Sequence, residues 1–479
     1  MPTRRNLIAV TSLLALAAPF ARVQANLARG SANTMSPYGA VRNVKDHTSG
    51  LELLKLPGGF SYQSYGWTGD LMDDGTPTPS RHDGMAVISA QDGKLLLMRN
   101  HERAFAPRIG TIETPCYDDY HTQMPGMGGG TTAIRFEAGA FVGAQATLAG
   151  TLINCAGGPT PWHSWLTCEE TVLRTSHLGA KDHGYVFEVP DPQLAKASGV
   201  PIIGMGLMRH EAAAVDPLSG SVYLTEDNGR YSGFYRYLPS DTSQRFGALE
   251  NGGRLEIMRL ESGDLHSLIP GETVVVGWIP VAAPNADPEL LRSPLQGFPG
   301  MRGSGRSGPF LQGQGDGAAA FRRGEGCWHA DGVIYFVETA GGPLRQGALW
   351  AHHIKNATLT LLFASPSNAI ADNPDNVTVS PRGGILICED GRGGFLPTGE
   401  FRGNRLIGID ADGQAFTFCE NNVVIDQALP AHPGIAADDY RGQEFAGATF
   451  DPTGEYLFVN IQTPGITFAI SGPWHEGPL

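Results

Sequence analysis

The chain alternates short apolar runs with turns that contain glycine, and one arrangement of the two recurs. In four places an apolar run begins just after a turn glycine and closes on a polar residue six positions beyond that glycine. Two looser copies lie at 91–100 and 157–170. The four close copies end on Glu226, Glu338, Glu389 and Asn460. Each run has the length and composition of a β-strand.

The segment before each turn also recurs. His-Asp-Gly-Met-Ala-Val at 82–87 parallels His-Glu-Ala-Ala-Ala-Val at 210–215, and comparable segments lie at 325–328, 376–379 and 444–450. Each unit therefore predicts a hairpin whose first strand opens, and whose second strand closes, on a polar residue. About six such hairpins predict an all-β fold, namely a six-bladed β-propeller with long Gly/Pro-rich loops between blades. The segment 280–324 is expected to be one of these loops.

Polar residues at the same end of the innermost strands of a propeller would converge on its central channel. Carboxylates brought together there repel one another and lose hydration, so they require cations between them. The oxygen atoms of Asp, Glu and Asn are hard ligands that suit calcium. The alternative is that each carboxylate caps its own turn or pairs with a local arginine. The repeat thus indicates either a cation site or a set of separate structural contacts.

Composition supports a turn-rich globular protein, because 64 glycines and 34 prolines accompany an apolar content of 41%. The formal net charge of −14 argues against nucleic acid as a partner. Six cysteines show no CxxC pair and no compact disulfide framework. Cys168 and Cys388 each end an apolar run before a glutamate, which predicts buried thiols. Cys155 instead lies in a Gly-rich segment.

The N-terminus carries an export signal. Arg4 and Arg5 form a twin-arginine pattern, which precedes an apolar run over 7–20 and small residues that end at Ala25. We expect cleavage after Ala25, a single propeller domain over 26–479, and export through the twin-arginine translocon to the periplasm or beyond. The apolar run of 14 residues is too short for a comfortable membrane span, so no stable membrane anchor is expected.

From about residue 36 to residue 474 the chain resembles the PhoX-type alkaline phosphatases, which are exported by the twin-arginine route. The motifs that carry the resemblance lie at 66–70, 74–76, 82–85, 99–102, 154–158, 160–162, 165–170, 210–212, 323–325 and 389–391. The resemblance implies a six-bladed propeller that hydrolyses phosphate monoesters with iron and calcium ions in its mouth.

The resemblance also implies roles for individual residues. Cys155 matches the thiolate that holds iron, Glu211 and Glu325 match the glutamates that hold iron, and Arg323 matches the arginine that binds phosphate. The remaining acids and amides at strand ends are candidate calcium ligands: Glu169, Glu170, Glu226, Asp227, Asp375, Asn376, Glu389 and Asp390. Clustered metals and a bidentate arginine suit phosphoester hydrolysis on general chemical grounds.

Two other functions fit parts of the sequence. A calcium-dependent propeller hydrolase of the lactonase type could use Glu325, Glu338 and Asn376, although it would have little use for Cys155 or Arg323. A non-catalytic periplasmic propeller could use calcium only to join its blades. Phosphatase assays with and without iron would separate these three hypotheses.

Overall fold

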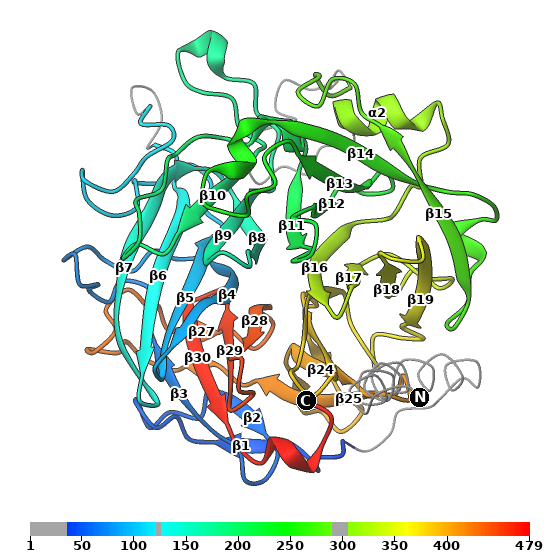
Figure 1. Ribbon diagram of the computed structural model, residues 1–479. Coiled ribbons are helices and arrows are strands. Elements are labelled where there is room, and N and C mark those ends of the chain that lie inside the picture. The colour runs from blue at the N-terminus through cyan, green and yellow to red at the C-terminus, as the bar shows by residue number, and fades with distance from the viewer. Residues whose placement is uncertain (1–35, 121–125, 290–304) are drawn as a thin grey trace, which may run out of the picture.

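The computed structural model describes residues 36–120, 126–289 and 305–479. Its strands form antiparallel sheets arranged around a centre, as in a propeller (Figure 1). Within the described residues, six innermost strands contact one another in a closed ring, in the order β4, β8, β11, β16, β20, β28 and back to β4. The β-propeller prediction is confirmed. The expected signal peptide, residues 1–25, lies outside the described residues.

The blades follow the chain. Blade 1 contains β4 (His82–Gln91), β5 (Lys94–His101), β6 (Gly129–Glu137) and β7 (Ala140–Thr151). Blade 2 contains β8 (Asn154–Pro159), β9 (Ser164–Glu169) and β10 (Val186–Pro190). Blade 3 contains β11 (His210–Val215), β12 (Val222–Glu226), β13 (Phe234–Pro239), β14 (Gly253–Leu260) and β15 (Thr273–Pro280).

The second half of the ring repeats this plan. Blade 4 contains β16 (Gly324–Ala330), β17 (Val333–Glu338), β18 (Ala348–His353) and β19 (Thr358–Ala364), and β19 pairs with β15 of blade 3. Blade 5 contains β20 (Pro374–Val379), β21 (Ile385–Glu389), β24 (Arg405–Ile409) and β25 (Ala415–Asn421), extended by β2 (Leu54–Leu56) and β1 (Arg42–Val44). Blade 6 contains β28 (Phe445–Phe450), β29 (Tyr456–Ile461), β30 (Ile466–Ser471) and β3 (Ser61–Tyr65).

Short elements decorate the loops between the blades. Two small hairpins pair β22 (Gly394–Phe395) with β23 (Phe401–Arg402) and β26 (Val424–Ile425) with β27 (Asp438–Asp439). The described 3₁₀ turns cover Ser176–Leu178, Ile203–Met205, Ala248–Asn251, Leu265–Ser267 and Trp474–Glu476. Part of the loop expected at 280–324 is helical, because α2 (Gly308–Gln314) begins there behind the capping hydroxyl of Ser307, while 290–304 lie outside the described residues.

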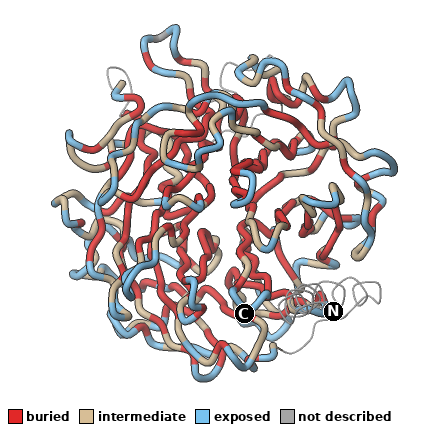
Figure 2. Tube along the Cα trace, viewed as in Figure 1, coloured by how far each residue is buried: buried red, intermediate tan, exposed pale blue. Residues whose placement is uncertain are grey.

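The core lies between the blades. Strands of the inner half of the blades, such as β9, β11, β12 and β28, are buried along their whole length because each packs against a neighbouring blade on both faces (Figure 2). Leu386 and Phe416 of blade 5, for example, share one apolar cluster with Leu457 and Phe468 of blade 6. No helix in the described part of the chain has the length and apolarity needed to cross a lipid bilayer.

Candidate active site

A β-bulge opens the innermost strand of every blade. In blade 3, His210 pairs with Glu226, and the next aligned pair joins Ala213 to Leu224, so three steps on β11 oppose two on β12. The same shift occurs in blades 1, 2, 4, 5 and 6. A bulge re-aims the side chain of the unpaired residue. The first bulged residues in the six blades are Asp83, Cys155, Glu211, Glu325, Asp375 and Gly447.

These bulged residues meet in the mouth of the channel. A cavity of about 270 Å³ is lined by Cys155, Glu211, Glu325 and Asp375. The Cys155 Sγ atom lies 3.2 Å from Oε1 of Glu211 and 3.7 Å from Oδ1 of Asp83. Five blades therefore contribute a side chain that can bind a metal, whereas blade 6 contributes a glycine at this position.

A second set of acids surrounds the first. Each of these acids follows the last residue of the second strand of its blade, and all of them line the same cavity: Glu102, Glu170, Asp227 and Asp390. Glu444, which directly precedes β28, completes the wall at blade 6. The mouth of the channel therefore holds far more carboxylates than arginines.

Burial sets the ionisation of these groups. It raises the pKa of Asp83 to about 7 and, together with the charge of Asp227, it raises the pKa of Glu325 to about 8. Burial and neighbouring carboxylates also raise the pKa values of Glu211, Asp375 and Glu444 well above their usual range. Burial, together with the neighbouring carboxylates, also raises the pKa of the Cys155 thiol well above its usual value. Such a set is stable in ionised form at neutral pH only with compensating positive charge.

The donor atoms are close enough to share cations. Four groups of three ligand atoms each fall within 4.8 Å of one another: Glu102–Cys155–Glu170, Asp83–Glu102–Glu444, Glu211–Glu325–Asp375 and Asp375–Asp390–Glu444. The groups overlap, since Glu102, Asp375 and Glu444 each belong to two of them. One group contains a thiol and suits a transition metal, whereas the oxygen-only groups suit a harder ion such as calcium.

Arg323 supplies positive charge at the edge of this set. Its backbone has φ +58° and is held by a hydrogen bond from its amide to the carbonyl of Gly229, at 2.7 Å. Its guanidinium lies 2.8 Å from Oε1 of Glu325 and 3.2 Å from Oδ2 of Asp227. Although burial lowers it, these two charges hold the pKa of Arg323 above its usual value. The guanidinium is thus fixed beside the cavity in its charged form.

Three of the acids singled out in the sequence lie outside this cavity. Glu169 accepts hydrogen bonds from the amides of Leu152 and Gly184 and pairs with His183 at 2.7 Å. Glu226 and Glu389 are engaged in the same way within their own blades, by the Tyr235 hydroxyl and by the Arg405 guanidinium, each at 2.6 Å. Each of these three side chains joins strand ends of its own blade.

Asn376 occupies an intermediate place. Its Nδ2 donates to Oδ1 of Asp375 at 3.1 Å, and its Oδ1 accepts from the amide of Gly447 at 2.7 Å. The side chain therefore orients the carboxylate of Asp375 and connects blade 5 to the bulge of blade 6.

Sequence reasoning passed over Asp83, Glu102 and Glu444 as site residues. The repeat contained the signal for one of them, because Asp83 aligns with Glu211 in the paired segments 82–87 and 210–215. Glu102 corresponds to Glu170, since each follows the residue that pairs with the start of the innermost strand.

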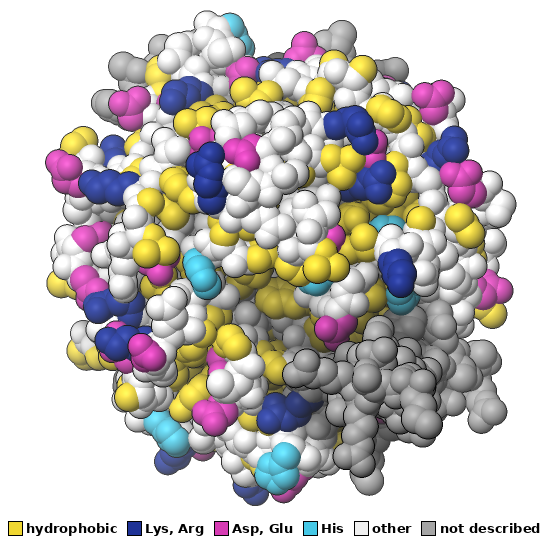
Figure 3. Space-filling model, viewed as in Figure 1, with side chains coloured by type: hydrophobic (Ala, Val, Ile, Leu, Met, Phe, Trp, Pro, Cys, Tyr) yellow, Lys and Arg dark blue, Asp and Glu magenta, His cyan; other side chains and the backbone are white. Residues whose placement is uncertain are grey.

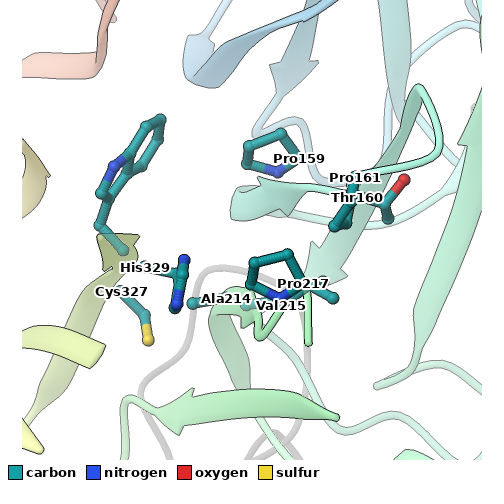
Figure 4. Close-up of a pocket in the computed structure, with 10 residues that line it drawn as sticks. Pro159, Thr160, Pro161, Ala214, Val215, Pro217, Cys327 and His329 are labelled. Atoms are coloured by element: carbon teal, nitrogen blue, oxygen red, sulfur yellow. The ribbon is translucent and has the colours of Figure 1, made fainter. Parts of the chain in front are cut away.

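The other end of the channel has a different character. Where β8, β11 and β16 end, a pocket of about 200 Å³ is lined by Pro159, Val215, Pro217 and His329 among mainly apolar neighbours (Figure 4). Hydrophobic side chains also gather around the central hollow of the face seen in Figure 3. The metal-binding types of side chain described above are therefore concentrated at the end where the bulges lie.

Comparison with known proteins identifies the family of the chain and a solved structure with a similar fold. The family model described as alkaline phosphatase PhoX matches residues 36–144 and 119–465. The structure of Pseudomonas fluorescens PhoX in complex with vanadate, a transition state analogue, is similar at 16% identity and a TM-score of 0.62, over 92% of this chain and 99% of that chain.

A gluconolactonase from Xanthomonas campestris is similar at 12% identity and a TM-score of 0.34, over 82% of this chain and 97% of that one. No curated protein sequence matches significantly. The match to the family model covers most of the chain, and the chain therefore belongs to the PhoX family of alkaline phosphatases.

Proposed function

We propose that this phosphatase is a metal-dependent, exported enzyme that hydrolyses phosphate monoesters in the acidic cavity at the bulged end of the channel. The observation that carries the proposal is the convergence of Asp83, Cys155, Glu211, Glu325 and Asp375 from five bulges, with Arg323 beside them. Buried acids with raised pKa values are a costly arrangement unless cations are bound among them.

The donor chemistry suggests how the residues divide among ions. We assign Cys155 to iron, because a thiolate favours a transition metal over calcium. We assign Glu211 and Glu325 to the same iron centre, because Oε1 of Glu211 lies 3.2 Å from Cys155 Sγ and Glu325 shares a ligand group with Glu211. We assign Asp227, Asp375 and Asp390, together with Asp83 and Glu444, to calcium, because their oxygen atoms suit a hard cation. Glu102 and Glu170 are also assigned to calcium, and their place within 4.8 Å of Cys155 Sγ puts them between the two kinds of ion. When bound, such ions supply Lewis acidity and lower the pKa of coordinated water.

Arg323 is assigned to the phosphate. Its planar guanidinium presents paired donors that match two non-bridging phosphate oxygens. Asp227 and Glu325 hold it in place before substrate arrives, so little conformational entropy is lost on binding. Because its charge persists at alkaline pH, Arg323 can stabilise the charge that develops on the phosphoryl oxygens throughout the reaction.

The experiment measures metal content and turnover together. Protein purified without chelators is expected to contain iron and calcium and to hydrolyse an aryl phosphate monoester, and removal of the metals should abolish turnover until they are returned. Glu211→Gln should lower both metal content and turnover. A suitable control is Glu188→Gln, since Glu188 is equally buried but accepts hydrogen bonds from Ser164 and Trp162 far from the cavity. Full turnover in demonstrably metal-free protein would contradict the proposal.

A further inference from the structure

A second, larger hollow adjoins the acidic cavity. It has a volume of about 510 Å³, against about 270 Å³ for the cavity itself. Arg81, Glu102 and Glu170 line both spaces, so the two are joined along a shared wall. A molecule whose phosphate lies in the acidic cavity can therefore extend into the hollow without leaving the protein surface. The hollow has the size of a small-molecule subsite.

Three arginines from three places in the chain surround this space, which we call the arginine hollow: Arg81, Arg103 and Arg209. Arg81 directly precedes β4, Arg103 lies two residues beyond β5, and Arg209 directly precedes β11. Their presence is notable in a chain with a formal net charge of −14. The hollow therefore differs in charge from the protein as a whole.

The backbones of these arginines are fixed by strand ends. The carbonyl of Arg81 accepts from the amide of Glu102 at 2.9 Å, and the carbonyl of Arg103 accepts from the amide of Ile153 at 2.9 Å. The carbonyl of Arg209 accepts from the amide of Asp227 at 3.2 Å. The backbone of each arginine is thus held by a rigid element next to a residue of the acidic cavity, which is expected of a preorganised subsite.

Two of these side chains, Arg81 and Arg103, differ in their contacts. Arg81 donates to Oε1 of Gln462 at 2.7 Å, which anchors it at the junction of the two spaces. The guanidinium of Arg103 is partly buried, and within the described residues it forms no hydrogen bond or ion pair. Such a half-buried cation without a counter-ion is costly, and it becomes favourable when an anion is bound.

The two glutamates of the hollow also line the acidic cavity. Glu102 and Glu170 lie within 4.8 Å of Cys155 Sγ through their carboxylate oxygens, so their charge is directed to the proposed metal centre. A ligand beyond them meets the arginines instead. The hollow is therefore suited to an anionic group that is separate from the reacting phosphate.

The geometry points to a second anion subsite, formed by Arg81, Arg103 and Arg209, that selects phosphate monoesters whose alcohol portion carries another negative group, such as a carboxylate or a second phosphate. This inference rests on the proposed function, because it places the reacting phosphate beside Arg323. The reaction itself is unchanged: water still replaces the alcohol at phosphorus, and the alcohol leaves with its additional charge intact.

Two matched esters test the subsite. 3-Phosphoglycerate and glycerol 3-phosphate differ in that a carboxylate of the first replaces a hydroxymethyl group of the second. We expect the native, metal-loaded enzyme to prefer 3-phosphoglycerate in kcat/KM. The ratio of the two kcat/KM values should fall about tenfold in Arg103→Gln, the usual effect of losing one charge-assisted hydrogen bond. The control Arg254→Gln alters an exposed arginine of β14 that pairs with Glu256 and should leave the ratio unchanged.

The outcomes separate the inference from the proposed function. Equal loss of activity toward both esters in Arg103→Gln and Arg209→Gln, at a constant ratio, would show a structural role and overturn the subsite. Should neither ester be hydrolysed, the proposed function fails, and calorimetric binding of both compounds to the metal-loaded protein decides the subsite: preferential binding that is lost in Arg103→Gln supports it, and equal binding overturns it. Arg209→Gln provides the same measurement if Arg103→Gln does not fold.

Discussion

Adjacent residues at one strand end have opposite environments. Glu169 is the last residue of β9 and points into its own blade, where His183 and three backbone amides engage its carboxylate. Glu170 comes next in the chain and lines the acidic cavity. Since successive side chains of a strand point to opposite sides, only one of the two can face the channel. The same division separates Glu226 from Asp227 and Glu389 from Asp390.

Arg323 gives the first prediction at this scale. Arg323→Ala should leave the metals bound but lower kcat/KM about 10²- to 10³-fold, because a fixed donor to the charged phosphoryl group is lost. Arg323→Lys keeps the charge but loses the paired donors, so its kcat/KM should lie between those of the native enzyme and Arg323→Ala. Steady-state kinetics with metal analysis on the same samples checks this. An unchanged kcat/KM in Arg323→Ala would show that Arg323 does not bind the phosphate.

The cysteines give the second prediction. Cys155→Ser replaces a thiolate with a poor iron ligand, so iron content and turnover should fall together. Cys168 is the matched control, because it is fully buried in the apolar cluster of Leu166 and Val186, away from the cavity. Cys168→Ser should cost about 1–3 kcal/mol of stability, yet keep its activity per folded molecule. Wild-type iron and turnover in Cys155→Ser would rule out thiolate ligation.

At the scale of elements, the bulge in each repeated hairpin directs one side chain of the innermost strand towards the mouth of the channel. Blade 6 departs from the others with Gly447, whose φ of +62° and close approach to Asp83 leave no room for a side chain. A Cβ atom there would lie 2.5 Å from the Asp83 carbonyl oxygen. Gly447 thus allows blade 6 to close against blade 1 without displacing the backbone of Asp83.

Gly447→Ala should therefore destabilise the protein by about 1–3 kcal/mol or more and also reduce turnover, because relief of the contact displaces Asp83. Gly394→Ala is the control, since its backbone is unstrained and no atom lies within 4 Å of the added methyl group. Thermal unfolding and phosphatase assays measure the two effects. Native stability in Gly447→Ala would mean that the bulge can relax at no cost.

The sequence predicted the hairpins and the convergence of their polar ends, because apolar runs and turn glycines are local signals. It did not show that Glu170 rather than Glu169, or Asp390 rather than Glu389, lines the cavity. Which acid does so depends on where the pairing between strands ends. It also passed over Asp83, although the repeat aligned it with Glu211, since bulges are visible only in the register between strands. Arg103 carries no local signal at all, because its role depends on packing between blades.

At the scale of the whole molecule, the acidic cavity couples pH to stability. In metal-free protein the folded state raises the pKa of Asp83 to about 7 and that of Glu325 to about 8, mainly through burial. Despite burial, Glu169 and Asp118 raise the pKa of His183 to about 9. All three groups hold protons more tightly when folded than when unfolded, so their contribution to stability is lost as pH rises through these values.

Metal-free protein should accordingly unfold at a temperature several degrees lower at pH 9 than at pH 7. Each unit by which a group's pKa differs between the folded and unfolded states changes the free energy of unfolding by about 1.4 kcal/mol. Added calcium should reverse the part of the loss that comes from Asp83 and Glu325, because it binds the ionised carboxylates of the folded state, whereas the part that comes from His183, outside the cavity, should remain. Differential scanning calorimetry at both pH values, with chelator or calcium, measures this. A pH-independent midpoint in both conditions would contradict a cation-dependent cavity.

Export is the remaining property at this scale. Replacing Arg4 and Arg5 with lysine should hold folded, active enzyme in the cytoplasm, because the twin-arginine translocon requires the arginine pair. Cell fractionation with phosphatase assays measures the distribution. Undiminished activity in the periplasm of cells that express the variant would exclude this route.

The closure of blade 6 has a consequence for the order in which the protein is made. β3 pairs with β30, so residues 61–65, which are synthesised early, have no strand to pair with until residues 466–471 have been synthesised. Until nearly the whole chain has been synthesised, the sixth blade has its outer strand β3 but lacks its three inner strands, and the ring stays open. Asp83 and Glu444 then have no fixed distance between them. The ions proposed for the mouth can therefore bind only after synthesis ends, and a translocon that transports unfolded chains would export the protein without them.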